Sequence, residues 1–241
     1  MIHRIKQGAL FCCLILMGWL TSCTDYNFVE TGRAKAYHDT SMLTYFKGDN
    51  YNYSYLVYLI NRAGLNEVFE GKSTYGSHIT FIAPTNHSIR RYLLKTYTAT
   101  QSDEATTDGL STRAAFDKDA ATDSMIMHLI DAISVDSCRN IVLSHVIPNE
   151  NLQLEDFARG EKSISGEAIG KGGKLYTMAS GTQLWMYTFA SSYGGVAGAG
   201  PLVLHVVSPT TQVERVVASH NIRTNTGTVH ALQYNFTLFE F

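Results

Sequence analysis

The fold is decided by one stretch of the chain, Ile79-Thr80-Phe81-Ile82-Ala83-Pro84-Thr85-Asn86. Its first five residues are almost wholly apolar and rich in β-branched and aromatic side chains, which predicts a buried strand. Pro84 ends this strand, because proline has no N–H to donate and favours an extended conformation at Ala83. Thr85 or Asn86 then offers a side-chain oxygen that can cap the first turn of a following helix. The stretch therefore predicts a buried strand, a stop and a capped helix.

Helical periodicity lies on both sides of this stretch. Leu56, Leu59, Ile60 and Ala63 recur at helical spacing, and Gly64 is well placed to end that helix. After it, residues 125–133 carry an apolar helical stripe. The segment 135–137 offers a cap for a further helix that carries Cys138, Ile141, Val142, His145 and Val146 and ends at Pro148.

From residue 151 the period changes toward two, which predicts strands. The predicted strands are residues 174–178, 182–189, 202–207, 212–218, 228–232 and 234–239. Helices come mostly first and strands mostly later. This order is typical of an α+β fold and not of alternating βαβ units.

The first residues are typical of a signal peptide. His3, Arg4 and Lys6 precede a hydrophobic run, residues 9–20, that is too short for an ordinary membrane-spanning helix. Leu20-Thr21-Ser22-Cys23 matches a bacterial lipobox, which predicts a lipoprotein signal peptide over residues 1–22 and lipidation of Cys23. Its acyl chains would hold the protein at a membrane. The alternative is a plain secretory signal with an incidental cysteine. Residues 23–40 are then a polar tether, and a single domain follows over residues 41–241.

Composition narrows the function classes. Hydrophobic residues make up 45% of the 241 residues, as in an ordinary globular protein, and the net charge of −2 argues against a nucleic-acid partner. Cys138 is the one cysteine left after processing and lipidation, so we expect no internal disulfide and a buried thiol. Tyr51, Tyr53 and Tyr55 are a candidate binding surface, an aromatic platform of the kind that stacks on sugars. The alternative is that their rings pack in the core.

Three stretches resemble motifs of the fasciclin-like (fasciclin I) domain. Residues 80–86 are similar to its first motif, residues 140–147 to its Tyr-His-containing helix, and residues 226–232 to its second motif. Ser144 stands where the family has tyrosine, whereas His145 and His230 are kept; Asn225, Ala231 and Gln233 depart from the usual pattern. The resemblance implies a wedge-shaped β-sheet of about seven strands flanked by helices, with insertions near residues 96–119 and 191–200. It also implies structural roles for the motif residues Pro84, Thr85, Asn86, His145 and His230.

A search for catalytic constellations finds none. The chain has no Gly-x-Ser-x-Gly, Ser-x-x-Lys or His-Glu-x-x-His motif, and its nine histidines never recur at the spacing of helical metal sites. The glycine-rich segment 194–200 lacks the Lys-Ser/Thr of a phosphate loop and is followed by Pro201, which favours a hairpin or loop. We therefore expect no enzyme activity, no metal and no cofactor.

These observations favour a non-enzymatic adhesion or binding module, anchored by lipid in the cell envelope, with the outer membrane as the expected location. The resemblance implies a protein or glycan partner of the envelope or of a host. The alternative is an accessory or structural subunit of an outer-membrane nutrient-uptake assembly, with the tyrosine-rich segment and the insertions as contact surfaces. The sequence leaves open whether the protein faces the periplasm or the cell surface, what its oligomeric state is, and which ligand it binds.

Overall fold

The computed structural model of the chain describes residues 35–104, 123–235 and 241. The predicted signal peptide and Cys23 lie outside these residues, as do most of the tether, the segment 105–122 and most of the strand predicted at 234–239. The residues from Ala36 onward form one compact unit. Within the described residues this unit is α+β, with a seven-stranded sheet and six α-helices, so the predicted fold class is confirmed.

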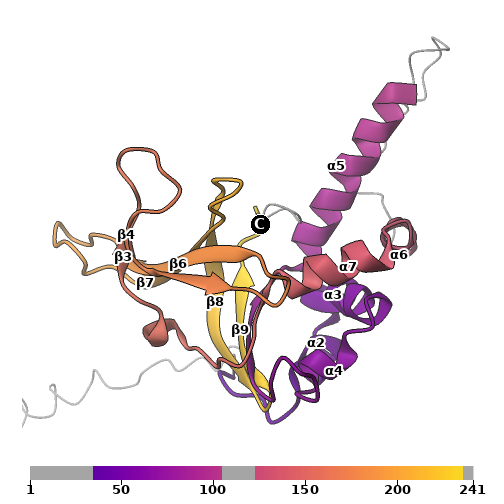
Figure 1. Ribbon diagram of the computed structural model, residues 1–241, viewed down its shortest axis with the longest axis horizontal. Coiled ribbons are helices and arrows are strands. Elements are labelled where there is room, and N and C mark those ends of the chain that lie inside the picture. The colour runs from indigo at the N-terminus through magenta and orange to yellow at the C-terminus, as the bar shows by residue number, and fades with distance from the viewer. Residues whose placement is uncertain (1–34, 105–122, 236–240) are drawn as a thin grey trace, which may run out of the picture. The chain divides into compact units, whose positions relative to one another are not determined.

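Most of the helices gather on one side of the sheet (Figure 1). Their bounds are α2 (Met42–Gly48), α3 (Asn50–Arg62), α4 (Asn66–Phe69), α5 (Asn86–Glu104), α6 (Asp123–Asp131) and α7 (Val135–Leu143). Gly64 follows α3 with a φ of 66°, the left-handed conformation expected of a helix-ending glycine. The polar region predicted as an insertion from residue 96 is helical as far as Glu104, because α5 continues through it. That this region is an insertion relative to the family stays a prediction.

The end of α7 also differs from the prediction. Its N-cap is Ser134, whose side chain accepts a hydrogen bond from the backbone N–H of Ser137, so the cap lies one residue before the predicted segment. The helix ends at Leu143 and not near Pro148. His145 lies beyond the helix, and Val146–Ile147 form the short strand β2, because the chain turns there to pair with β1.

The sheet has the strand order β2-β1-β9-β8-β7-β6-β5. The strands are β1 (Ile79–Ala83), β2 (Val146–Ile147), β5 (Lys174–Thr177), β6 (Gln183–Ala190), β7 (Leu202–Val207), β8 (Glu214–Thr224) and β9 (Gly227–Leu232). A separate hairpin consists of β3 (Gly160–Glu161) and β4 (Lys171–Gly172), and the one-turn 3₁₀ helix η1 (Leu154–Asp156) precedes it. At the far side, the backbone N–H of Ala179 donates to the carbonyl of Val146, so the turn after β5 lies against the opposite edge strand β2.

Strand β8 is longer than the predicted strand 212–218. Its pairing with β9 shifts register twice, between Val217 and Ile222, and Asn221 has a φ of 58°. Such a β-bulge lets a strand continue where the alternation of its side chains is broken. The Asn221 side chain then accepts a hydrogen bond from the backbone N–H of Leu154, so the bulge also holds η1 beside the sheet.

Strand β1 has the predicted bounds and all five of its residues are buried. It pairs in parallel with β9 and antiparallel with β2. The Phe81 side chain of this strand packs against Phe46 of α2 and Phe69 of α4, with ring centroids 5.7 and 4.9 Å apart. Aromatic rings at such distances pack favourably in tilted or edge-to-face geometry. The core therefore lies between this part of the sheet and the helices, and Cys138 is a free, buried thiol within it.

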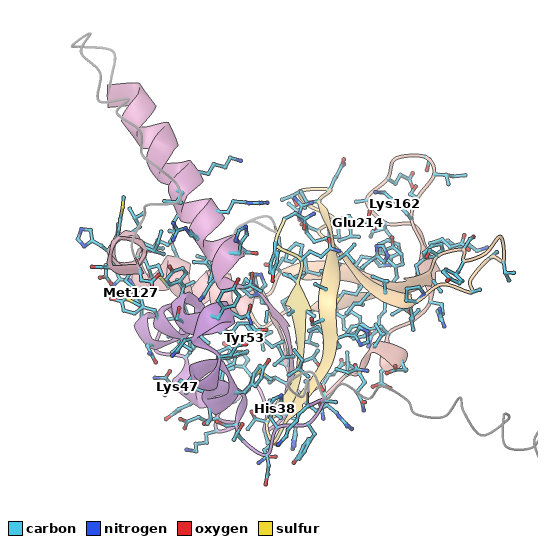
Figure 2. All side chains as sticks on the ribbon, turned by 180° about the vertical axis from the view of Figure 1, so that it is seen from behind. His38, Lys47, Tyr53, Met127, Lys162 and Glu214 are labelled. Atoms are coloured by element: carbon cyan, nitrogen blue, oxygen red, sulfur yellow. The ribbon has the colours of Figure 1, made fainter. Side chains whose placement is uncertain are left out.

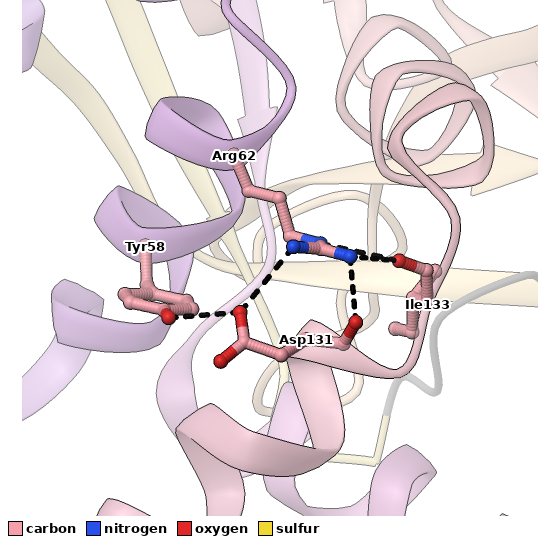
Figure 3. A network of polar contacts seen from close by, with 4 residues as sticks. All are labelled: Tyr58, Arg62, Asp131 and Ile133. Atoms are coloured by element: carbon pink, nitrogen blue, oxygen red, sulfur yellow. Dashed lines mark hydrogen bonds and ion pairs between the residues drawn. The ribbon is translucent and has the colours of Figure 1, made fainter.

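Helices α3 and α6 are joined by a polar network (Figure 3). The guanidinium of Arg62 donates to the backbone carbonyls of Asp131 (2.6 Å) and Ile133 (2.7 and 3.1 Å), and it lies 3.4 Å from the Asp131 carboxylate. The Tyr58 hydroxyl donates to the same carboxylate at 2.8 Å. Arg62 thus pairs carbonyl groups that the end of α6 leaves without intrahelical partners.

The domain begins earlier than predicted. Tyr37 forms a parallel bridge with Arg223 of β8, and the backbone N–H groups of Arg223 and Asn225 donate to the carbonyls of Ala36 and Thr40. Residues 36–40 were predicted to belong to the tether. They are instead held against the sheet, because the end of β8 offers them unpaired backbone groups.

Candidate binding site on the outer face of the sheet

The predicted tyrosine platform is wrong for two of its three residues. Tyr53 and Tyr55 are only 3% and 4% exposed, whereas Tyr51 is 85% exposed. Tyr53 packs its ring 4.9 Å from that of Phe46, and Figure 2 shows it inside the molecule. The Tyr55 hydroxyl donates to the carboxylate of Asp123. Positions 53 and 55 lie about 200° apart around α3, and the two rings are buried by different neighbours, Phe46 and Asp123. The three tyrosines therefore present no common surface.

Asn86 holds two helices together and does not cap its own helix. Its side-chain Oδ1 accepts from the backbone N–H of Tyr55 (2.9 Å), and its Nδ2 donates to the carbonyls of Asn50 and Tyr51 and to the Ser54 hydroxyl, each at 2.9 Å. These four bonds tie the start of α5 to α3.

Thr85 occupies the N-cap position of α5, because its carbonyl accepts from the N–H of Ile89. Its hydroxyl is buried and has no hydrogen-bond partner among the described residues. The prediction that the side chain of Thr85 or Asn86 caps the helix was therefore wrong. Pro84 is buried directly after β1.

His145 and His230 lie on opposite sides of one residue of β1. The N–H of Ile82 donates to the carbonyl of His145, and Ile82 pairs in register with His230 of β9. His145 Nδ1 lies 2.8 Å from the Ile141 carbonyl, and His230 Nε2 lies 3.0 Å from the Leu152 carbonyl. Because a carbonyl only accepts, His145 carries its proton on Nδ1 and His230 carries its proton on Nε2. Burial lowers the pKa of each imidazole to about 4, so both are neutral at pH 7.

A different set of polar and aromatic residues lies on one face of β6, β7 and β8. We call this face, which is opposite the main core, the outer face. Alternation along β6 places Trp185, Tyr187 and Phe189 on this face. Tyr187 stacks on Trp185 at 4.4 Å and on His205 of β7 at 4.7 Å between ring centroids. Trp185 and Tyr187 are buried in a small apolar cluster separate from the main core. The Trp185 indole donates to the carbonyl of Gly172, so the β3–β4 hairpin holds that end of the stack.

Glu214 of β8 is the centre of this face. Its Oε1 accepts from the Tyr187 hydroxyl (2.6 Å) and pairs with His205 Nδ1 (2.9 Å), while its Oε2 pairs with the Lys162 ammonium (2.5 Å). Figure 2 shows Lys162 and Glu214 next to each other, although they come from different parts of the chain. Register explains the geometry, since β6 and β8 are the two neighbours of β7.

The protonation states of this cluster follow from its contacts. Burial on its own raises the pKa of Glu214, but the bonds from Lys162, Tyr187 and His205 outweigh it and hold the pKa below its ordinary value. Burial, followed by the bond to Glu214, raises the pKa of the Tyr187 hydroxyl. At pH 7 Glu214 is therefore an anion that only accepts hydrogen bonds, and His205 Nδ1 carries a proton.

A surface cavity of about 330 Å³ opens over this cluster. It is lined by Lys162, Tyr187, Phe189, His205, Glu214 and Val216. A second cavity of about 320 Å³ lies beside it, between the β3–β4 hairpin and the β6–β7 loop, and Phe189 lines both. Phe189 is 41% exposed. Volumes near 300 Å³ are at the lower end of those of small-molecule sites. The opening is therefore lined by aromatic rings, a carboxylate and an ammonium, which are groups that can bind a ligand.

Comparisons with known proteins give one type of match. The chain is similar to the solved structure of a FAS1 domain pair from the insect cell adhesion molecule fasciclin I, with 12% sequence identity and a TM-score of 0.38. The alignment covers 81% of this chain and 45% of that one, so the chain spans less than half the length of the protein it matches. No protein-family model and no curated protein sequence matches the chain.

The outer-face cluster was not predicted from the sequence. One signal was available, because Trp185, Tyr187 and Phe189 alternate along a predicted strand and so had to share a face. This alternation does not predict which charged residues lie beside the rings. Lys162 and Glu214 are separated by 52 residues and meet only because the β3–β4 hairpin lies close to β8.

Proposed function

We propose that this protein is a fasciclin-like adhesion or binding module of the cell envelope. In this proposal it is non-enzymatic, is anchored through a lipid on Cys23 and contacts a protein or glycan of the envelope or of a host. The outer-face cavity is its candidate contact site.

One observation carries the proposal, namely that the three motif segments meet at β1. The first motif, residues 80–86, includes four of the five residues of β1. The stretch 140–147 supplies β2, which pairs with Thr80 and Phe81. The second motif, residues 226–232, supplies β9, which pairs with all five residues of β1. Segments that lie up to about 150 residues apart in sequence thus form adjacent strands, as parts of one structural unit do. This is the arrangement expected if the three stretches belong to one fasciclin-like domain.

The chemistry of the described residues favours binding over catalysis. No group of three or more histidine, cysteine, aspartate or glutamate side chains in this part of the chain could hold a metal ion. Glu214, the most strongly bonded carboxylate of the outer face, has its pKa held below the ordinary value, which opposes the raised pKa that general acid catalysis at neutral pH requires. A carboxylate fixed by three donors instead suits orientation of a ligand.

The anchor rests on the lipobox. No helix among the described residues is long and apolar enough to cross a membrane. We expect full-length protein from its native membranes to partition into the detergent phase of Triton X-114, and the Cys23→Ala variant to partition into the aqueous phase. Detergent-phase partitioning of Cys23→Ala would overturn the anchor.

The binding function is tested with the full-length lipidated protein, immobilised through a C-terminal tag and incubated with solubilised cell envelopes. We expect retention of an envelope protein or glycan, recovered chemically unchanged by mass spectrometry. Retention of nothing above a tag-only control would contradict a binding module, and a cleaved or modified ligand would contradict the non-enzymatic assignment. Co-purification in fixed ratio with outer-membrane uptake proteins would favour the accessory-subunit alternative.

A further inference from the structure

We propose that the outer-face cavity binds a neutral sugar residue. Phe189 would lie against the apolar face of the sugar ring, while Glu214, His205 and Lys162 bond its hydroxyls. This inference rests on the proposed binding function and names the ligand class of the same site.

The first argument is the balance of donors and acceptors. The Glu214 carboxylate accepts three hydrogen bonds, two at Oε1 and one at Oε2. Oε2 can therefore accept a further hydrogen bond from a ligand. His205 donates through Nδ1, and the Nε2 of a neutral imidazole is then an acceptor. The Lys162 ammonium donates one of its three N–H groups to Glu214, and the other two are available to a ligand. The cavity thus offers acceptors and donors side by side, which matches hydroxyl groups, since each hydroxyl both donates and accepts.

The second argument is charge. Lys162 and Glu214 form an ion pair at the cavity and neutralise each other. The other four lining residues include no further lysine, arginine, aspartate or glutamate. An anionic ligand would meet the Glu214 carboxylate, and a cationic ligand would meet the Lys162 ammonium. A neutral polar ligand avoids both repulsions.

The third argument is the apolar wall. Phe189 is 41% exposed, and its ring stands edge-on to His205, with 6.4 Å between their centroids. Beneath it, Tyr187 and His205 are stacked and already bonded to Glu214, so these groups keep their positions without a ligand. Fixed polar groups lower the ordering cost of binding. A partly exposed ring beside fixed polar groups fits a ligand with one apolar face and a polar edge, which is the shape of a pyranose.

The fourth argument is the adjoining cavity. It shares Phe189 with the first, and it is lined by Arg159, Glu161 and Lys171 among others. A sugar in the first cavity could therefore continue into the second through a glycosidic bond. This geometry favours a sugar that is part of an oligosaccharide over a free monosaccharide.

The test uses the full-length protein in a detergent without a sugar headgroup, because a maltoside would compete for the cavity. Binding is measured by saturation-transfer difference NMR with glucose, galactose, mannose, N-acetylglucosamine, maltose and cellobiose. Glucuronic acid and glucosamine serve as charged counterparts. We expect a signal from at least one neutral sugar, tighter binding of a disaccharide than of its monosaccharide, and weaker binding of the charged counterparts.

Variants assign the signal to the cavity. Phe189→Ala and Lys162→Met change exposed side chains, so the fold is expected to persist, which circular dichroism checks. We expect Phe189→Ala to weaken binding of the neutral sugar about tenfold and Lys162→Met to weaken it several-fold. Tyr193→Ala is the matched control, since this exposed aromatic residue of the β6–β7 loop lines neither cavity. Its binding should stay unchanged.

Three results would overturn the inference. These are the absence of signal from every neutral sugar, an undiminished signal in folded Phe189→Ala, and tighter binding of a charged counterpart than of its neutral parent. If the immobilised protein still retains an envelope partner under any of them, the proposed binding function stands and the sugar site falls. If it retains nothing, both fall.

Discussion

Asn86 bonds both members of a backbone pair in α3. Its Oδ1 accepts from the N–H of Tyr55 and its Nδ2 donates to the carbonyl of Tyr51, each at 2.9 Å. In a regular α-helix these two groups, four residues apart, bond each other. The first residue of α5 therefore contacts α3 through the helix backbone itself, and this contact fixes β1 and its following helix against the N-terminal helices.

We expect Asn86→Ala to lower the free energy of unfolding by about 1–3 kcal/mol, because it leaves the partly buried groups of α3 without these partners. Urea denaturation of the full-length protein, followed by circular dichroism, measures the change. Asn61→Ala is the control, since Asn61 is an exposed residue of the same helix and a substitution there should change stability by about 0.5 kcal/mol or less. Equal stabilities of the two variants would show that the Asn86 contacts are not stabilising.

Gly227 lies where β9 passes closest to β1, and we expect Gly227→Ala to prevent stable folding. A Cβ at this position would stand 1.8 Å from the carbonyl oxygen of Ile79, and its φ is 133°. Neither backbone can move away without breaking the parallel pairing of β1 and β9. Gly181→Ala is the control, since Gly181 also has a positive φ, of 88°, but open space around its Cβ.

The control should therefore carry only the conformational cost, about 1 kcal/mol. Urea denaturation of both variants separates the two effects. Similar losses of stability in Gly227→Ala and Gly181→Ala would mean that the close approach to Ile79 is unimportant.

The sequence could predict those parts of the fold that depend on neighbours along the chain. Strand β1 was found with its bounds, because a run of five residues that is apolar except for Thr80 is followed by Pro84, and both features act locally. Strand β7 was found with its bounds for the same kind of reason. The cap of α7 was missed by one residue, since Ser134 and Ser137 are both acceptable caps by residue type.

The parts that depend on distant neighbours could not be predicted. Tyr53 and Tyr55 have polar hydroxyls that are equally compatible with an exposed or a buried ring, and their burial is decided by Phe46 and Asp123. The outer-face site depends on the strand order, which places β7 between β6 and β8. Alternation assigned Tyr187 to a face, but the position of Glu214 beside it requires the register of three strands.

Arg62 holds the end of α6 through its planar guanidinium, and we expect Arg62→Lys to destabilise the protein by about 1–2 kcal/mol. Arg62 donates to the Ile133 carbonyl through both Nε and Nη2, and through Nη2 also to the Asp131 carbonyl. A lysine ammonium has a single nitrogen and cannot reproduce this set of bonds. Urea denaturation measures the loss. Arg91→Lys, at an exposed position of α5, should leave stability within about 0.5 kcal/mol. An Arg62→Lys variant as stable as this control would refute the role.

His145 and His230 make the stability of the fold dependent on pH. Burial lowers the pKa of each from 6.5 to about 4 in the folded state. Between these values the unfolded chain binds protons that the folded protein does not, so stability falls as the pH falls from 6.5 toward 4. Below about pH 4 the folded histidines also bind protons, and their contribution levels off. Each histidine accounts for a loss of about 3 kcal/mol over this range.

Urea denaturation at half-unit steps from pH 7.5 to pH 4 measures this slope. His230→Gln removes one titrating group and should about halve the slope between pH 6.5 and 4, whatever it does to stability at pH 7. His128→Gln is the control, because His128 is an exposed residue of α6, and its slope should equal that of the unchanged protein. Glu214, whose pKa is held below 4.5 in the folded protein, loses its contribution to stability only as the pH falls from about 4.5 downward, so it adds to the slope only at the acidic end of this range. A slope unchanged in His230→Gln would mean that His230 is protonated in the folded protein, which its bond to the Leu152 carbonyl and its burial oppose.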